Sequence, residues 1–233
     1  MKILAFETSA KAASVALLEK GKLLGESYQN TGLTHSQTLM VMAEDLLKTC
    51  NLSVKDVDAV AVAAGPGSFT GVRIGVAAAK GFAWGGELPC YGVSTLEAMA
   101  RSLGVWDGFV VPAMDARRNQ VYTAIFRAEK GNLNRVEDDM AISLAELGEK
   151  IKNFDKPVFL VGDGANLCYN TLLEEVPGLV LPPEHRMHQR AAGVALAAQA
   201  MADSGNPGNA AELTPNYLRL SQAERERLAR ENR

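Results

Sequence analysis

Hydrophobic and polar residues alternate in short blocks along the first thirty positions of the chain. Three of these blocks, residues 2–8, 13–18 and 23–28, have the length and pattern of β-strands. Short polar turns separate them, one at Ser9-Ala10-Lys11 and one around Gly21. The pattern therefore predicts that the chain opens as a hairpin-like run of three strands.

The hydrophobic spacing then lengthens to three and four residues, which predicts a helix. Thr34 followed by Gln37 has the form of a capping box at its start. The apolar positions at helical spacing are Leu39, Met42, Ala43, Leu46 and Cys50. Met40, Val41 and Leu47 add apolar surface outside this stripe, which indicates a helix covered on two sides.

A short apolar run at residues 57–64 predicts a buried strand, and glycines at 65, 67, 71 and 75 follow it. We place the next helix at residues 76–86, a strand at 90–93, and a helix capped by Ser94 with Glu97. A glycine loop between strand and helix directs backbone N–H groups at an anion. It has no Gly-Lys-Ser/Thr ending, so it is not a Walker loop, and a tight turn explains the glycines equally.

The same order of elements starts again near residue 104. Its predicted elements are strands at 109–114, 120–127 and 133–140, a helix capped by Ser143 with Glu146, a strand at 158–161, a turn at Gly162-Asp163-Gly164 into a helix, and an Ala-rich helix at 189–201. Two halves of this order suggest the duplicated α/β fold of the actin, hexokinase and Hsp70 (ASKHA) superfamily. We expect subdomains at residues 1–104 and 105–233, with the last helix packing back on the first subdomain.

Composition narrows the function classes. Apolar residues make up 47% of the 233 positions and charged residues 22%, as in ordinary globular proteins. The net charge of −3 argues against autonomous binding to an RNA backbone, which usually needs a basic surface. Three scattered cysteines form no C-x-x-C pair, so we expect reduced thiols in the cytoplasm. No apolar run is long enough to cross a membrane.

The end of the chain, residues 221–233, alternates arginine and glutamate without aromatic residues. Mixed charges at this density are typical of a solvated helix end. A nucleic-acid arm is the less favoured interpretation, because it usually carries aromatic side chains that stack on bases.

The glycine run Gly65-Pro66-Gly67-Ser68-Phe69-Thr70-Gly71-Val72-Arg73-Ile74-Gly75, together with the opening Ile3-Leu4-Ala5-Phe6-Glu7-Thr8-Ser9, resembles the TsaB (YeaZ) family. Further matching motifs are His35-Ser36-Gln37, Met114-Asp115-Ala116-Arg117-Arg118 with Val121-Tyr122, Gly162-Asp163-Gly164-Ala165 and Pro215-Asn216-Tyr217-Leu218-Arg219. The resemblance covers nearly the whole chain. It implies the ASKHA fold and a structural or interface role for Asp115 and Arg117.

In nucleotide-handling members of that superfamily, the first hairpin carries a carboxylate and hydroxyls near a metal-bound phosphate. The resemblance therefore implies a vestigial nucleotide site at Glu7, Thr8, Ser9, Gly162, Asp163 and Gly164. Many TsaB relatives have Asp at the position of Glu7, so the longer side chain is a departure. Two plainer interpretations stay open: Thr8 and Ser9 bond their own backbone at a strand end, and the second glycine turn is only a turn.

Metal binding and nucleophilic catalysis find little support in the sequence. TsaD proteins, the catalytic relatives, carry a His-x-x-x-His motif, whereas His35 has no second histidine in that register. His185 and His188 lie in a polar stretch after Pro182-Pro183 without a third soft ligand, and we expect two exposed loop histidines. There is no G-x-S-x-G elbow. We predict no metal, no cofactor and no catalytic residue.

Two helices have the composition of a partner surface. Small residues four apart, such as Gly71, Gly75 and Ala79, let another element approach a helix closely. The approaching element is either a partner's helix or the domain's own sheet. By resemblance, these two helices of TsaB pair with the equivalent helices of TsaD. The predicted interface residues are His35, Leu39, Met42, Leu46, Gly71, Arg73, Gly75, Ala78 and Ala79.

The resemblance implies a non-catalytic subunit of the machinery that transfers threonylcarbamoyl to the adenosine beside a tRNA anticodon. Its expected partners are a TsaD-like catalytic subunit, a TsaE-like ATPase and, when TsaD is absent, a second copy of itself; tRNA is reached only through the complex. Two alternatives are a nucleotide-dependent phosphotransferase or ATPase of the same fold, and an adaptor that binds tRNA directly.

Overall fold

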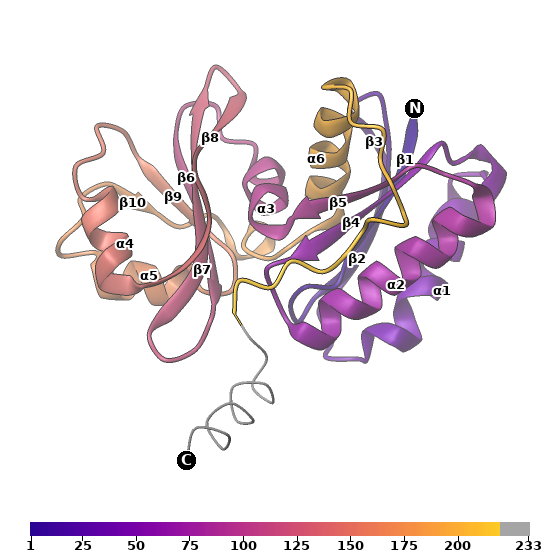
Figure 1. Cartoon of the computed structure of the whole chain (residues 1–233). Helices are drawn as coiled ribbons and strands as arrows, with labels where there is room; N and C mark the ends of the chain where they lie inside the picture. Colours follow the sequence, from indigo (N-terminus) through magenta and orange to yellow (C-terminus); the bar gives the residue numbers. More distant parts are fainter. Residues whose placement is uncertain (220–233) are drawn as a thin grey trace, which may run out of the picture.

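Two mixed β-sheets form the centres of two lobes, which lie side by side in the computed structural model of the chain (Figure 1). The structure describes residues 1–219. The charged tail at 221–233, and the prediction made for it, lie outside the described residues. None of the helices within residues 1–219 has the length and apolar character needed to span a membrane.

The first sheet has the strand order β3-β2-β1-β4-β5. Its strands are β1 (Lys2–Glu7), β2 (Ala13–Glu19), β3 (Lys22–Gln29), β4 (Ala59–Gly65) and β5 (Cys90–Ser94). β1, β2 and β3 pair antiparallel as a meander, whereas β4 and β5 join parallel to β1 through helical crossovers. The predicted meander is confirmed.

The second sheet repeats this arrangement strand for strand. Its strands are β6 (Gly108–Asp115), β7 (Gln120–Glu129), β8 (Asn132–Ser143), β9 (Val158–Val161) and β10 (Leu179–Val180). The order β8-β7-β6-β9-β10, with an antiparallel meander followed by two parallel strands, equals that of the first sheet. The duplication predicted from the sequence is therefore confirmed. The two-residue β10 gives no detectable period and was not expected.

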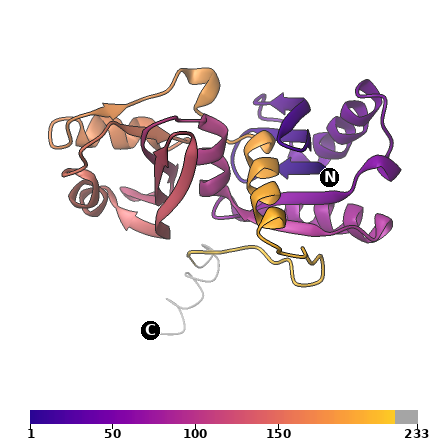
Figure 2. The ribbon, with the colours of Figure 1, turned by 90° about the horizontal axis from the view of Figure 1, so that it is seen from above.

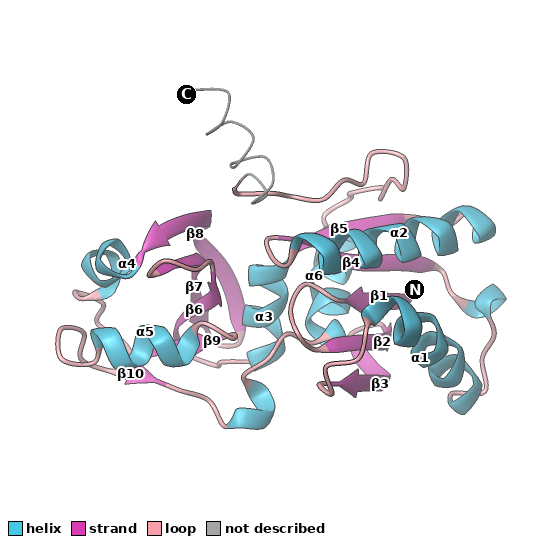
Figure 3. Ribbon diagram, turned by 90° about the horizontal axis from the view of Figure 1, so that it is seen from below, coloured by secondary structure: helices cyan, strands magenta, loops and turns pink. Residues whose placement is uncertain are grey.

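Six α-helices and two 3₁₀ turns complete residues 1–219. They are α1 (His35–Thr49), η1 (Val54–Asp56), α2 (Phe69–Gly86), α3 (Thr95–Leu103), α4 (Leu144–Ile151), α5 (Ala165–Leu172), η2 (Glu184–Arg186) and α6 (Ala191–Asp203). Figure 1 shows α1 and α2 on one side of the first sheet and α6 on the other, and Figure 2 shows α6 from above. α3 lies between the two sheets, and α4 and α5 cover the side of the second sheet that points away from the first lobe (Figure 3).

β1 shows why a central strand of this fold is an uninterrupted apolar run in the sequence. Leu4 and Phe6 pack with α1 and α2, while Ile3 and Ala5 pack with α6. Because both faces of the strand are covered by helices, every residue from Ile3 to Phe6 is fully buried. A central strand of this kind shows no polar alternation.

Of the three helix caps that the sequence predicts at Ser94, Ser143 and Thr34, two are confirmed and one is wrong. The caps at Ser94 and Ser143 are confirmed, since each hydroxyl accepts from the N–H three residues on. The capping box at Thr34 is wrong: its side chain makes no cap bond, and its backbone carbonyl accepts from Gln37 N at 2.9 Å instead. The carbonyl closes the first turn without the hydroxyl.

α2 begins at Phe69, seven residues before the start expected from its glycines. Ser68 caps it, because the Ser68 hydroxyl accepts from Gly71 N at 3.3 Å. Glycine inside a helix costs about 0.5–1 kcal/mol relative to alanine, so propensity alone predicts a loop here. Packing of the glycine-bearing turns against β1 outweighs that preference, as the contacts below show.

Candidate functional site

The carboxyl end of β1 is sealed inside the first lobe. Glu7, Thr8 and Ser9 are all fully buried. The Thr8 hydroxyl donates to the carbonyl of Gly71 in α2 at 2.8 Å, and Ser9 N donates to Glu7 Oε1 at 2.5 Å. The expectation that the Thr8 hydroxyl bonds its own backbone is wrong, because Gly71, without a side chain, brings its helix carbonyl within reach of that hydroxyl.

Burial raises the pKa of Glu7 to about 7; the hydrogen bond from the Ser9 backbone N–H opposes this rise, and the charge of Asp163 adds to it. Glu7 Oε2 and Ser9 Oγ have no hydrogen-bond partner among the described residues. A buried carboxylate without partners for both oxygens is costly, so a proton is favoured there at a higher pH than usual.

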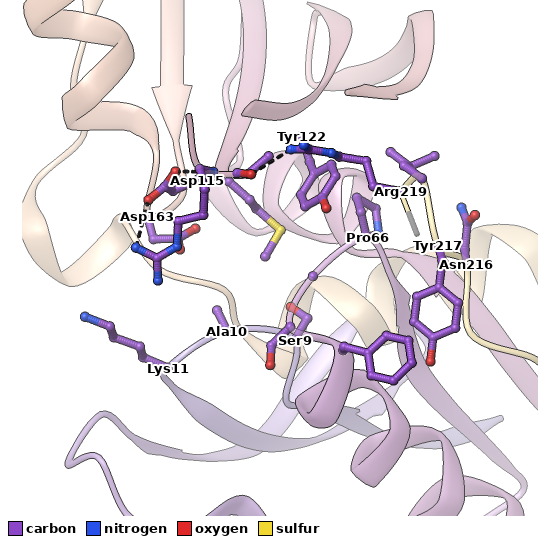
Figure 4. Close-up of a pocket in the computed structure, with 17 residues that line it drawn as sticks. Ser9, Ala10, Lys11, Pro66, Asp115, Tyr122, Asp163, Asn216, Tyr217 and Arg219 are labelled. Carbon is purple, nitrogen blue, oxygen red and sulfur yellow. Dashed lines mark hydrogen bonds and ion pairs between the residues drawn. The ribbon is translucent and has the colours of Figure 1, made fainter. Parts of the chain in front are cut away.

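A cleft of about 560 Å³ lies between the lobes (Figure 4). Its walls come from segments far apart in the sequence: the β1–β2 turn, the start of α2, the β6–β7 turn and residues 216–219. Among the six residues predicted for a vestigial nucleotide site, only Ser9 and Asp163 line this cleft. Glu7 is fully buried and is not among the residues that line the cleft.

Asp163 follows β9 in a turn that requires glycine. Gly162 has a φ of +110°, and a Cβ there would collide with the backbone of Ala113. The Asp163 carboxylate accepts from Gln189 Nε2 at 3.2 Å, and burial raises its pKa. Tight packing of the turn on β6 thus accounts for the glycines, as the plainer interpretation of this motif requires.

The cleft carries charges of both signs. Lys11 and Arg117 line it together with Asp115 and Asp163. Asp115 Oδ1 accepts from Arg117 N at 2.7 Å, and Asp115 Oδ2 lies 3.7 Å from Arg117 Nη1. Within residues 1–219, no three His, Cys, Asp or Glu side chains gather closely enough to hold a metal ion. His185 is exposed as expected, whereas His188 is half-buried, and its Nε2 lies 3.3 Å from Oε1 of Glu184.

The predicted partner stripe on α1 lies inside the lobe. Leu39, Met42 and Leu46 are only 1–7% exposed and belong to the core between α1, α2 and the first sheet. These three residues must therefore be corrected to core residues, because the stripe at helical spacing faces the chain's own sheet. His35 anchors the start of α1, with Nε2 lying 2.8 Å from the carbonyl oxygen of Ala10.

The first glycines of α2 also serve the chain's own packing. A Cβ at Gly71 would collide with the carbonyl oxygen of Thr8, and a Cβ at Gly75 with the Thr8 hydroxyl and Val62. Ala79 is fully buried on the same side. The alternative left open by the sequence, an approach by the domain's own sheet, is the correct one for these three residues.

The opposite face of α2 is open. Arg73, Ala77, Gly81 and Gly85 follow each other at intervals of four, and all are exposed. A Cβ at Gly81 or Gly85 would meet no atom within 4 Å. Large apolar side chains are exposed on α2 and on the neighbouring helix α1 (Figure 1): Trp84 of α2 is 65% exposed, and Met40 and Val41 of α1 are 47% and 57% exposed.

We call this open surface the outer face, defined by Arg73, Ala77, Gly81, Trp84 and Gly85 of α2 with Met40 and Val41 of α1. The half-buried Ala78 lies between the inner and outer sides of α2. Among the predicted interface residues, only Arg73 belongs to the outer face. The sequence contains one signal that Ala77, Gly81 and Gly85 share a face with Arg73, because they follow it at intervals of four residues.

Comparison with known proteins agrees with this architecture. Residues 29–226 match the family model described as TsaD: tRNA N6-adenosine threonylcarbamoyltransferase. The tRNA threonylcarbamoyladenosine biosynthesis protein TsaB of Bacillus subtilis is 35% identical over 231 residues, 96% of each chain. TsaB of Escherichia coli is 38% identical over 169 residues, 70% of this chain and 72% of its own. YeaZ from Pseudomonas aeruginosa superposes with a TM-score of 0.77 at 27% identity, over 93% of this chain and 99% of that one.

The repeated sheet order and the cleft between the lobes define a protein with the duplicated α/β fold expected from the sequence. Among proteins of that fold, identity over nearly the full length of the Bacillus protein decides the family. The chain belongs to the TsaB (YeaZ) family.

Proposed function

We propose that this chain is a non-catalytic subunit in the biosynthesis of threonylcarbamoyladenosine in tRNA. It acts by binding a TsaD-like catalytic subunit through the outer face. The observation that carries the proposal is the pair Gly81 and Gly85, exposed in the C-terminal half of α2 with open space where their side chains would be.

Glycine at such positions weakens the isolated helix by about 0.5–1 kcal/mol per residue relative to alanine. Within residues 1–219 no element packs there to compensate this cost. A partner helix that approaches closely over Gly81 and Gly85 supplies the missing contacts. Met40, Val41 and Trp84 supply apolar area around that approach, which supports a protein partner.

The names of the relatives support the reaction class. The Bacillus and Escherichia proteins are biosynthesis proteins of tRNA threonylcarbamoyladenosine, and the matching family model is a threonylcarbamoyltransferase. The acidic balance of the chain supports access to tRNA through the complex. A TsaE-like ATPase completes the proposed assembly, and the outer face pairs two copies of the chain when TsaD is absent.

The test is a binding titration of the purified chain with its cognate TsaD-like protein. Ala77→Arg places a long charged side chain in the centre of the outer face and should weaken binding at least about tenfold. Ala145→Arg, at an exposed position of α4 in the other lobe, is the matched control and should bind like the wild type. A well-folded Ala77→Arg variant with unchanged affinity would falsify the proposal. Substitutions at Met42 or Gly75 do not serve here, since both positions are buried in the lobe.

The purified chain also serves to test the alternative function, a nucleotide-dependent enzyme. The observation that favours this alternative is that Ser9 and Asp163 line the cleft. Magnesium-dependent ATP turnover by the chain alone, lost in Asp163→Asn, would support that function. We expect no turnover above the level of the Asp163→Asn variant.

A further inference from the structure

The chain returns from α6 across both lobes as an extended segment. We call residues 206–219 the strap; Figures 1 and 2 show it in yellow, and Figure 3 draws it as loop throughout. Its first part lies on the first lobe, where Leu213 is buried against Gly92. Lys80 Nζ of α2 donates to the carbonyl of Leu213 at 3.0 Å, and Asn216 N donates to the carbonyl of Ala64 at 2.6 Å.

The strap is then held by the first turns of α2. Arg73 Nε donates to the Tyr217 hydroxyl at 2.9 Å. The Tyr217 ring stacks on Phe69 with 4.7 Å between centroids, and the Arg73 guanidinium lies 3.8 Å from the centre of the Phe69 ring. Three side chains therefore interlock at one point, which we call the catch: Phe69, Arg73 and Tyr217.

Two residues further on, the strap reaches the other lobe. Arg219 Nη1 donates to the carbonyl of Ala116 in the β6–β7 turn at 2.7 Å (Figure 4). Asn216, Tyr217, Leu218 and Arg219 form one wall of the cleft between these attachments. Within seven residues, from Leu213 to Arg219, the strap is thus bonded to both lobes beside the cleft.

The catch shares a row with the outer face. Arg73 is the first member of the series Arg73, Ala77, Gly81 and Gly85, which lies along one side of α2. Arg73 is exposed and Tyr217 is 39% exposed, so water competes with both partners of this hydrogen bond. Covering the row removes that water and strengthens the bond and the guanidinium–ring contact.

We propose that the strap is a latch that holds the two lobes together at the cleft, and that a protein seated on the outer face tightens it through the catch. The latch itself is independent of the proposed function, whereas its tightening rests on partner binding at the outer face. Through this connection, binding at α2 sets the cleft between the β1–β2 and β6–β7 turns.

The latch is tested on the chain alone by amide hydrogen exchange. Tyr217→Ala removes both the ring and the acceptor for Arg73, and the amide of Asn216 should then exchange about tenfold faster. Arg219→Ala should broaden the distribution of distances between the lobes, measured between spin labels attached at Lys55→Cys and Glu149→Cys. These two exposed positions lie in different lobes; Cys50, half-buried, is replaced by serine in the labelled protein.

Lys11→Ala is the matched control, because Lys11 lines the same cleft and does not belong to the strap. It should change neither the exchange of Asn216 nor the interlobe distance. If Tyr217→Ala and Arg219→Ala behave like Lys11→Ala, the strap is not a latch, whatever the outcome of partner binding.

Tightening is tested by adding the cognate TsaD-like protein. The Asn216 amide should exchange more slowly in the wild-type complex, and Tyr217→Ala should abolish this slowing. A complex that forms at normal affinity without slowing the exchange overturns the tightening and leaves the proposed function standing. If no complex forms with the wild type, the proposed function and the tightening fail together, while the exchange data on the chain alone still decide the latch.

Discussion

The two sides of α2 use the same residue for opposite purposes. On the inner side, Gly71 and Gly75 let β1 approach so closely that a methyl group would collide with Thr8. On the outer side, Gly81 and Gly85 face open space. The comparison teaches that a glycine in a helix has no fixed meaning, because what its missing side chain would meet decides whether it serves the fold or leaves a surface free.

The energetics of the two sides differ accordingly. Each glycine lowers helix stability by about 0.5–1 kcal/mol relative to alanine. Inside, the buried hydrogen bond from the Thr8 hydroxyl to the Gly71 carbonyl offsets part of this cost, and so does the apolar packing around Val62. Outside, no atom lies within 4 Å of the positions where side chains of Gly81 and Gly85 would be, so no packing within residues 1–219 offsets the cost there.

Adding a methyl group on the inner side should have the largest effect on stability. In Gly71→Ala the new Cβ collides with a backbone carbonyl that cannot rotate away, so α2 must shift off β1. We expect a loss of about 4 kcal/mol in the free energy of unfolding, measured by urea denaturation. Gly81→Ala is the matched control on the other side. A Gly71→Ala variant within about 1 kcal/mol of the wild type would show that the two sides do not differ.

The buried carboxyl group of Glu7 should make the free energy of unfolding depend on pH. Between the ordinary value of 4.5 and the folded value of about 7, folded Glu7 holds a proton that the unfolded chain has lost. The contribution of protonated Glu7 is therefore fully present below pH 4.5 and is lost as the pH rises to 7. The free energy of unfolding should fall by about 3 kcal/mol over this interval.

Glu7→Gln should remove most of this fall, since the amide does not titrate. Asp163, whose pKa burial also raises, keeps a smaller slope of the same sign in the variant. The measurement is urea denaturation at several pH values between 4.5 and 7.5. Glu146→Gln, at an exposed helix start where bonds from Ser143 lower the pKa, should leave the fall in place. An unchanged slope in Glu7→Gln would contradict the assignment.

Filling the outer side should have the smallest effect, and the opposite sign. Gly81→Ala and Gly85→Ala meet no neighbouring atom, so each should raise the free energy of unfolding of the chain alone by about 0.5–1 kcal/mol. The same variants should bind a TsaD-like protein more weakly, because a methyl group holds the partner helix away. Stabilisation without weaker binding would mean that no helix approaches these positions.

Much of the fold follows from the sequence. The two runs of three strands, the capped starts at Ser94 and Ser143, and the buried strand before the glycine loop were all readable, because local pattern and tertiary packing agree there. The start of α2 was not, because its glycines disfavour a helix locally and only contact with β1 stabilises one. Thr34 matched a capping pattern, yet the backbone carbonyl took that role.

The candidate site was less predictable. A helical stripe such as Leu39, Met42 and Leu46 shows that one side of a helix is covered, and the sequence does not say whether the cover is the chain itself or a partner. The open positions at Ala77, Gly81 and Gly85 carry no apolar signal. The catch joins Arg73 to Tyr217, which lie 144 residues apart, and no local pattern reports a contact over that separation.

The return of α6 and the strap to the first sheet has a consequence for synthesis on the ribosome. One face of the first sheet is covered by Ala191, Val194 and Ala198, and the core beneath α2 is completed by Leu213. At about 5–20 residues per second, the first lobe waits several seconds after its own strands emerge before these residues arrive. During that time its alanine-rich face is open to chaperones, and a nascent chain stopped before residue 191 exposes it permanently. Translation must therefore pass residue 213 before the lobe that emerges first can close.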